Sequence, residues 1–162
     1  MQPANRIVSS EAEELILVDA DDNEIGYRSK AECHDNGGVL HRAFSVFLFN
    51  RTGELLLHRR SAHKPLWPGF WTNSCCSHPR KGETYLEAAH RRVAEELGVQ
   101  ASLQYLYQFH YTADFEGLGS ENELCAVYAG VLDEGEAPAP NPLEIVEQQP
   151  RLVVAQESDG RI

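Results

Sequence analysis

The chain has 162 residues, which suits one domain with a sizeable hydrophobic core. Its 42% hydrophobic and 24% charged residues are ordinary for a soluble globular protein. The formal net charge of -11 argues against nucleic-acid binding, which needs a basic face, although local basic clusters still allow a small anionic ligand. No apolar run is long enough to cross a bilayer and no apolar signal segment begins the chain, so we expect no membrane partner.

The cysteines indicate the redox compartment. Four cysteines are too few for the dense disulfide framework of a small secreted domain. Cys75 and Cys76 are adjacent in the chain, and neighbouring cysteines do not pair easily with each other. We therefore expect free thiols and a cytoplasmic protein.

In chain order, the first expected elements are strands. Residues 1–14 are polar and should form a flexible N-terminus. Residues 14–30 predict a strand, an acidic turn and a second strand, and residues 40–60 predict a β-hairpin around the turn NRTGE. Residues 61–83 are rich in proline and aromatic residues, which predicts an irregular loop with one short extended piece.

One strong helix is expected next, over residues 84–99. Its apolar residues at helical spacing are Leu86, Ala89, Val93 and Leu97. Gly98 should end it, because glycine adopts the left-handed conformation that closes many helices.

Residues 103–113 and 122–132 predict further strands. Residues 133–162 should form an acidic, proline-rich linker and a shortened, atypical tail with at most one or two short strands. Strands dominate around one helix, so the expected class is α+β, an α/β sandwich with a mixed sheet. The domain proper should span residues 15–132.

Histidines and a Glu-x-Glu pair raise the question of a metal site. The candidate ligands are His34, His41, His78, Glu121 and Glu123. Residues i and i+2 of a strand share a face, so the two glutamates can converge. Imidazole with carboxylate suits Zn²⁺, Mn²⁺ or Fe²⁺. Scattered histidines are as often surface residues, so spacing alone leaves the site open, and no second Cys-x-x-Cys or Cys-x-x-His partner supports a zinc knuckle.

The strip NSCCSHPRKGE contains two neighbouring cysteines that need not do the same work. If residues 75–78 are extended, Cys76 and His78 point to one face and Cys75 to the other. This pattern predicts that Cys76 lies beside the candidate ligand and that Cys75 is a small apolar filler of the core.

The segment that follows resembles the Nudix box, a loop–helix–loop whose carboxylates face Mg²⁺ bound to a diphosphate. The matching positions are Glu83, Arg91, Val93, Glu95, Glu96, Gly98 and Val99. Two positions depart from the pattern: Ser77 replaces the first glycine, and Arg92 replaces the glutamate that follows the box arginine.

These departures point to one branch of the superfamily. The segments LHRAFSVFLFN, WPGFWTNSCCSHPRKGE, RRVAEELG and ENELCAVY resemble, in order and spacing, those of type I isopentenyl-diphosphate Δ-isomerases. The resemblance covers about residues 14–132 and implies the Nudix fold, a mixed β-sheet flanked by helices. It also implies isopentenyl and dimethylallyl diphosphate as substrate and product.

The resemblance assigns roles to the matching residues. Ligands of one divalent ion, Mn²⁺, Zn²⁺ or Mg²⁺, match His34, His41, His78, Glu121 and Glu123. Catalytic residues match Cys76, Glu123 and Tyr111. A Mg²⁺ ion that accompanies the diphosphate matches Glu96 and the backbone carbonyl of Cys76. Substrate-binding residues match Lys30, Arg60, Lys64, Arg92 and Trp71.

The implied reaction explains this choice of residues. Moving the double bond through a tertiary carbocation requires a proton donor and a proton acceptor that flank the hydrocarbon. Cys76 would be one partner, and Glu123 with Tyr111 the other. Aromatic faces that could shield the cation belong to Phe44, Trp67, Trp71 and Tyr111. Packing within the loop is the alternative role for both tryptophans.

The family pattern is not complete in this sequence. Relatives continue with a helical part whose tryptophan covers the hydrocarbon tail, whereas no tryptophan follows Trp71 here. We therefore expect weak or absent isomerase activity unless something else covers the pocket. A Nudix hydrolase of a diphosphate compound and an inactive metal-binding module are the alternatives. The expected assembly is a monomer or a weak homodimer.

Overall fold

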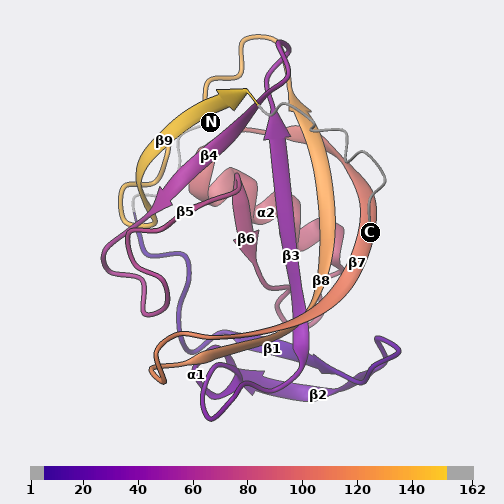
Figure 1. Cartoon of the computed structure of the whole chain (residues 1–162). Helices are drawn as coiled ribbons and strands as arrows, with labels where there is room; N and C mark the ends of the chain where they lie inside the picture. The colour runs from indigo at the N-terminus through magenta and orange to yellow at the C-terminus, as the bar shows by residue number, and fades with distance from the viewer. Residues whose placement is uncertain (1–5, 153–162) are drawn as a thin grey trace, which may run out of the picture.

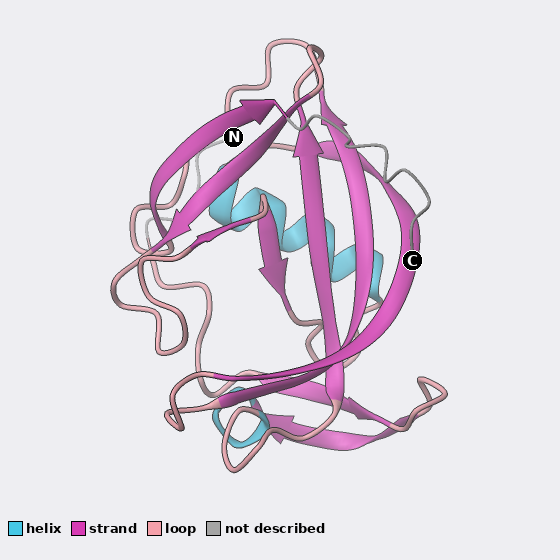
Figure 2. Ribbon diagram, in the orientation of Figure 1, coloured by secondary structure: helices cyan, strands magenta, loops and turns pink. Residues whose placement is uncertain are grey.

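The computed structural model describes residues 6–152, which form one mixed β-sheet with a long helix packed against it (Figures 1 and 2). The strands are β1 Glu14–Val18, β2 Glu24–Ser29, β3 His41–Phe49, β4 Glu54–Arg60, β5 Trp71–Thr72, β6 Cys75–Ser77, β7 Ala101–Asp114, β8 Ser120–Leu132 and β9 Ile145–Leu152. In the described part, the helices are α1 Lys30–Cys33 and α2 Tyr85–Leu97. The predicted α+β class with a mixed sheet is confirmed.

Strand β3 lies in the middle of the sheet and sets the positions of the site residues (Figure 1). It pairs in parallel with β8 along its whole length, with His41 opposite Glu123. Its other edge pairs in antiparallel fashion with β6, where Ser45 lies opposite Cys76. The sheet register alone therefore brings an imidazole, a carboxylate and a thiol into one neighbourhood.

The hairpin predicted for residues 40–60 forms only at its tip. The turn is present, because the N–H of Gly53 donates to the carbonyl of Asn50 at 3.0 Å. Strands β3 and β4 then pair only at Phe49 and Leu55. Further along, β4 pairs with β5 and β9, while β3 pairs with β6 and β8. The prediction is wrong along the strands because partners distant in sequence replace the local one.

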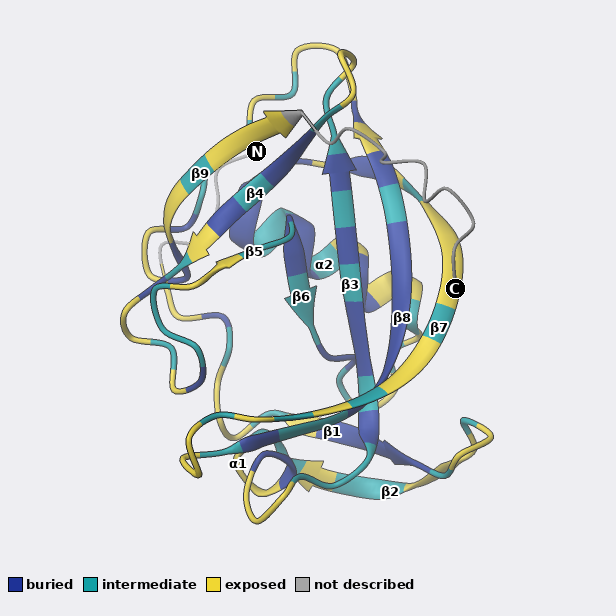
Figure 3. Ribbon diagram, in the orientation of Figure 1, coloured by how far each residue is buried: buried dark blue, intermediate teal, exposed yellow. Residues whose placement is uncertain are grey.

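Helix α2 begins and ends as predicted. Thr84 caps its N-terminus in a capping box with Glu87, and Gly98 ends it in the left-handed conformation with a φ of 66°. Its buried residues are Ala88, Ala89, Arg92, Val93, Glu96 and Leu97. This face packs against β3 and β6 and covers the main hydrophobic core (Figure 3). Leu86, predicted on the same face, is exposed instead.

Segments on both sides of the predicted domain pack onto it. Val8, within the predicted N-terminal segment 1–14, is buried against the domain. Strand β9 belongs to residues 133–162 and adds to the sheet beside β4. The predictions for residues 1–5 and 153–162 lie outside the described part. Within that part, neither helix is long and apolar enough to span a membrane.

Candidate active site

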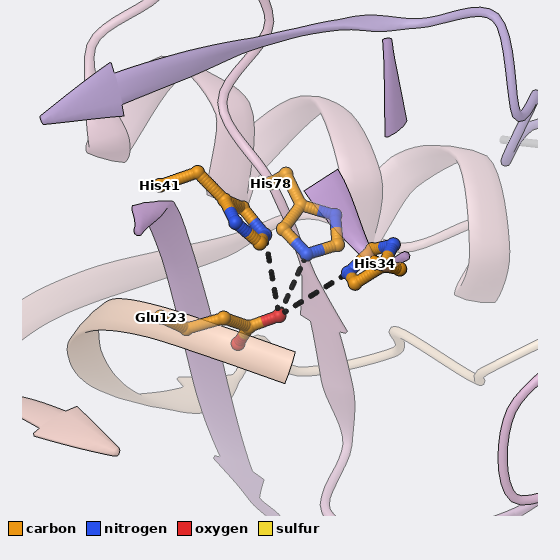
Figure 4. A group of neighbouring side chains, drawn as sticks. All are labelled: His34, His41, His78 and Glu123. Carbon is orange, nitrogen blue, oxygen red and sulfur yellow. Dashed lines mark hydrogen bonds and ion pairs between the residues drawn. The ribbon is translucent and has the colours of Figure 1, made fainter. Parts of the chain in front are cut away.

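Three imidazoles and one carboxylate converge on a single point (Figure 4). His34 follows α1, His41 begins β3, His78 follows β6 and Glu123 lies on β8. The Nε2 atoms lie 2.8, 3.6 and 3.8 Å from Glu123 Oε1 for His78, His41 and His34 respectively. Four segments distant in sequence thus supply one compact set of donor atoms.

This donor set fits a divalent metal ion. Nδ1 of His41 lies 2.6 Å from the carbonyl of Val39, which can only accept, so the proton sits on Nδ1 and the Nε2 lone pair faces Glu123. The Nε2 atoms of His34 and His41 are buried without a hydrogen-bond partner among the described residues. Burial lowers the pKa of His78 to about 3, so its ring is neutral, as a metal ligand must be. A cation between these lone pairs and the carboxylate would satisfy them all.

Glu121, predicted as a fifth ligand, lies beside this group rather than in it. The Tyr111 hydroxyl is 2.8 Å from Glu121 Oε2 and 2.6 Å from Glu123 Oε2, so it links the two carboxylates. Only the other four residues have donor atoms within 4.8 Å of one another. The carbon skeleton places Glu121 correctly on the same strand face, but its carboxylate turns towards the tyrosine.

The two carboxylates differ in acidity. Burial, and then the charge of Glu123, raise the pKa of Glu121 to about 7. Burial acts the same way on Glu123, but the neighbouring imidazoles, His78 first, outweigh it and hold the pKa of Glu123 well below its usual range. Burial and both carboxylates raise the pKa of Tyr111, so its hydroxyl stays protonated. Glu121 is therefore the weaker acid of the two carboxylates, and the protonated hydroxyl of Tyr111 lies between them.

Strand β6 separates the two neighbouring thiols. Cys76 Sγ donates to Asn73 Oδ1 at 2.6 Å and lies 3.4 Å from the hydroxyl of Ser45. Burial raises the pKa of the Cys76 thiol, so it is protonated at neutral pH. Cys75 is fully buried in the main core. The strand alternation predicted from the sequence is present.

One cavity joins most of the predicted site residues. Those in its wall are Lys30, His34, Arg60, Lys64, Cys76, His78, Arg92, Tyr111, Glu121 and Glu123. Phe44, one of the aromatic candidates, also lines it. The cavity therefore combines the metal-ligand group, the thiol and four cations.

Three predicted aromatic or acidic residues lie elsewhere. Trp71 is on β5 with 42% of its surface exposed, because pairing with Arg59 of β4 holds this short strand at the edge of the sheet. Trp67 packs against Phe115, with ring centroids 5.3 Å apart. Glu96 is buried outside the cavity wall, where its carboxylate accepts from Nε of Arg92 at 2.8 Å.

The Nudix-box side chains are bound to one another. Arg91 of α2 forms ion pairs with Glu83 at 2.6 Å and with Glu95 at 3.1 Å. It therefore links the loop before α2, which carries Glu83, to the helix. Arg92, which stands where the box has a glutamate, is buried and reaches the cavity. A cation therefore occupies a wall position at which the box pattern has a carboxylate.

The residues at or beside the cavity that are absent from the predicted set include Ser9, Ser45, Asn73 and Glu144. Ser45 has a sequence signal, because alternation along β3 places it on the same face as His41. The contact between Ser9 and Glu144 spans 135 positions, and no local pattern indicates it.

Gly38 allows the chain before β3 to approach β8 beside the metal-ligand group. A Cβ atom added there would lie 2.9 Å from Asn122 Cβ and 3.1 Å from Asn122 N. Gly38→Ala should therefore displace the strand that carries Glu121 and Glu123. We expect it to cost about 1–3 kcal/mol of unfolding free energy from overpacking, on top of the strain of a positive φ.

Gly37→Ala is the matched control, because Gly37 also has a positive φ but has no atom within 4 Å of an added Cβ. Urea unfolding of both variants separates the clash from the backbone strain. Equal losses of stability in the two variants would show that the close approach has no energetic consequence.

Comparison with known proteins gives the family. Residues 39–157 match the NUDIX domain. The chain is 51% identical over 121 residues to the isopentenyl-diphosphate Delta-isomerase of Serratia proteamaculans (strain 568), covering 75% of this chain and 67% of that protein. It is 42% identical over 135 residues to isopentenyl-diphosphate Delta-isomerase 1 of Photorhabdus laumondii, covering 82% of this chain and 76% of the relative.

Solved structures agree on the fold. DR0079 from Deinococcus radiodurans superposes with a TM-score of 0.69 at 29% identity, covering 86% of this chain and 83% of that one. A MutT protein from Methanosarcina mazei Go1 gives 0.57 at 20% identity, with 68% and 75% covered, and is similar in fold alone. This chain belongs to the isopentenyl-diphosphate Delta-isomerase family of NUDIX-domain proteins.

Proposed function

We propose that this chain converts isopentenyl diphosphate to dimethylallyl diphosphate, the activity for which its relatives are named. One observation carries the proposal: a single cavity holds both acid–base groups and a set of cations. Cys76, Tyr111 and Glu123 line it together with Lys64 and Arg92. A hydrocarbon attached to a diphosphate requires both kinds of group at once.

The reaction needs no net change in protons. One proton adds to the terminal CH₂ carbon of the double bond, which leaves a tertiary carbocation at the adjacent carbon. A different proton leaves the CH₂ group on the far side of that carbon, and its electron pair forms the new double bond. The protein must therefore present a donor and an acceptor to the same flat chain.

Cys76 is one of these groups, and the carboxyl of Glu123 with Tyr111 is the other. They come from different strands, β6 for the thiol and β7 and β8 for the other pair, and so can face the substrate from two sides. The hydroxyl of Tyr111 connects Glu123 to Glu121, which can return a proton after each turnover. Phe44 and Tyr111 supply aromatic faces to the carbocation.

The cations of the cavity wall would bind the diphosphate. They are Lys30, Arg60, Lys64 and Arg92. Guanidinium groups match phosphate oxygens in a bidentate fashion, and ammonium groups add point charges. Arg92 in place of a carboxylate favours holding the diphosphate over cleaving it, which disfavours the hydrolase alternative.

The proposed cofactors are two kinds of divalent ion. Zn²⁺, Mn²⁺ or Mg²⁺ suits the group of His34, His41, His78 and Glu123, with Glu121 nearby. An ion there would withdraw electron density from the Glu123 carboxyl and make it a stronger acid. A Mg²⁺ ion entering with the diphosphate stays a proposal. Glu96, its expected ligand, is bound to Arg92 and lies outside the cavity wall.

We also infer a cytoplasmic location and a monomer or weak homodimer. The supporting observation for the location is that Cys33, Cys75, Cys76 and Cys125 are all free thiols.

The direct test is incubation with isopentenyl diphosphate, Mg²⁺ and Mn²⁺ in D₂O, followed by NMR. We expect dimethylallyl diphosphate with deuterium in a methyl group, because the added proton comes from an exchanging protein group. Release of phosphate or of a monophosphate would favour a hydrolase. Metal binding with neither product would mean an inactive metal-binding module.

A further inference from the structure

A buried carboxylate lies directly behind the cationic wall of the cavity. Glu144 lies in the turn immediately before β9, is 2% exposed and is not itself in the cavity wall. Its Oε1 accepts from the backbone N–H of Val8 at 2.8 Å and of Ser9 at 3.1 Å. The hydroxyl of Ser9 adds a further bond at 3.0 Å to Oε2. Glu144 therefore fastens the N-terminal segment to the domain.

The same carboxylate binds two cations that do line the cavity. Its Oε2 accepts from Nζ of Lys64 and lies 3.7 Å from Nη2 of Arg92. Nζ of Lys64 also bonds to the hydroxyl of Ser9 at 2.9 Å. Ser9 is itself in the cavity wall. Glu144 is thus the common partner of three residues that line the cavity, Ser9, Lys64 and Arg92.

The backbone around Glu144 is fixed from both directions. Its carbonyl accepts from the N–H of Ser61, just after β4, at 3.0 Å, and its N–H donates to the carbonyl of Asn141, also at 3.0 Å. Asn141 in turn donates to the carbonyl of Glu96 at the end of α2 at 2.7 Å. The carboxylate is therefore held in one place by the sheet and the helix, as a positioning group must be.

The ionisation of Glu144 and Lys64 also favours a positioning role for Glu144. Burial alone would raise the pKa of Glu144, but Lys64, Arg92 and the N–H of Val8 outweigh it and hold the pKa to about 2. Glu144 is therefore anionic at neutral pH. Burial lowers the pKa of Lys64, and Glu96 and Glu144 oppose that effect. Removing the Glu144 charge would leave two buried cations less compensated.

We propose that Glu144 is a positioning residue that holds Lys64 and Arg92 at the cavity wall for the diphosphate and fastens Ser9 beside them, where the Ser9 hydroxyl links Glu144 to Lys64. The inference rests on the proposed function for the identity of the ligand. Glu144 does not touch the thiol or the metal-ligand group in the described contacts, so it acts on binding of the diphosphate rather than on proton transfer.

The test compares Glu144→Gln with Glu147→Gln. Glu147 lies on β9, three residues after Glu144, and is exposed, and the cation paired with it is Arg59 at 3.8 Å. For Glu144→Gln we expect the KM for isopentenyl diphosphate to rise about tenfold with kcat within about threefold, as the loss of ground-state binding predicts. Glu147→Gln should change neither. A tenfold fall in the kcat of Glu144→Gln at unchanged KM would overturn the proposal.

Binding of Mg²⁺–pyrophosphate by calorimetry gives a readout without turnover. The dissociation constant should rise by about the same tenfold in Glu144→Gln. If pyrophosphate binding weakens but no isomerisation is seen even in the unmodified protein, the proposed function fails and the positioning role stands. If isomerisation is seen and pyrophosphate binding is unchanged in the variant, the positioning role fails alone.

A double-mutant cycle shows whether Glu144 acts through Lys64. In the Lys64→Met background, Glu144→Gln should weaken pyrophosphate binding by less than about threefold, because its main partner is gone. A further full tenfold loss would overturn the proposal. Should Glu144→Gln fail to fold by circular dichroism, Ser9→Ala is the second variant, because it keeps the backbone bonds to Glu144. It should weaken pyrophosphate binding about threefold, and unchanged binding would count against the role of Ser9.

Discussion

Cys76→Ala should lower kcat for isomerisation by about 10³-fold, since a positioned acid–base group contributes roughly 10²–10⁴-fold. The thiol is protonated, faces the cavity and is held by Asn73 and Ser45. Alanine has no proton to give or take, and the remaining groups stay in place. The measurement is the rate of dimethylallyl diphosphate formation at saturating substrate.

Cys75→Ala is the matched control, one residue away on the same strand. Cys75 lies in the main core and faces away from the cavity, so its loss should cost about 1–2 kcal/mol of stability through a small void and leave kcat within about threefold. Both variants should bind Mg²⁺–pyrophosphate normally. Equal loss of activity in the two folded variants would refute the assignment of Cys76.

The separation of these thiols shows what sequence pattern can predict. Three residues in extended conformation fix which side chains share a face, and β6 has that conformation. The end of α2 is predicted equally well, because Gly98 acts within the last turn of the helix. Local rules succeed where the physical cause is local.

The metal-ligand group could not be predicted from the spacing of its residues alone. His34, His41, His78 and Glu123 converge because β3 pairs in parallel with β8, a pairing of strands about 80 residues apart. Spacing left that site open, and the family resemblance supplied it. The resemblance could not say that the Glu121 carboxylate turns to Tyr111, since a rotamer choice depends on neighbours in space.

Long-range partners also explain where the structure differs from local expectation. Strands β3 and β4 pair only at the turn because β4 pairs instead with β9, which belongs to the segment predicted as an atypical tail. Trp71 lies outside the cavity because β5 is an edge strand, and Glu96 is turned away by its pair with Arg92. Glu144 was unpredictable for the same reason, since its partners Ser9 and Lys64 lie far along the chain.

Removing the divalent ion with a chelator should abolish isomerisation and lower stability together. The buried Nε2 atoms of His34 and His41 face a carboxylate without a hydrogen-bond partner among the described residues, so the ion-free site leaves them unsatisfied. An ion present at 100–1,000 times its dissociation constant stabilises the fold by about 3–4 kcal/mol. Thermal unfolding before and after chelation measures this, and separate return of Zn²⁺, Mn²⁺ and Mg²⁺ identifies the ion.

Two histidine variants test whether the ion sits in this group. His34→Ala removes one ligand from the edge of the cluster and should reduce metal affinity by at least about tenfold, with a matching fall in activity at limiting metal. His63→Ala removes an exposed histidine outside the cluster and should change neither quantity. Because the metal titration is read by calorimetry, it does not depend on turnover. Equal metal affinity in the two variants would place the ion elsewhere, and full activity after complete chelation would remove the ion from the reaction.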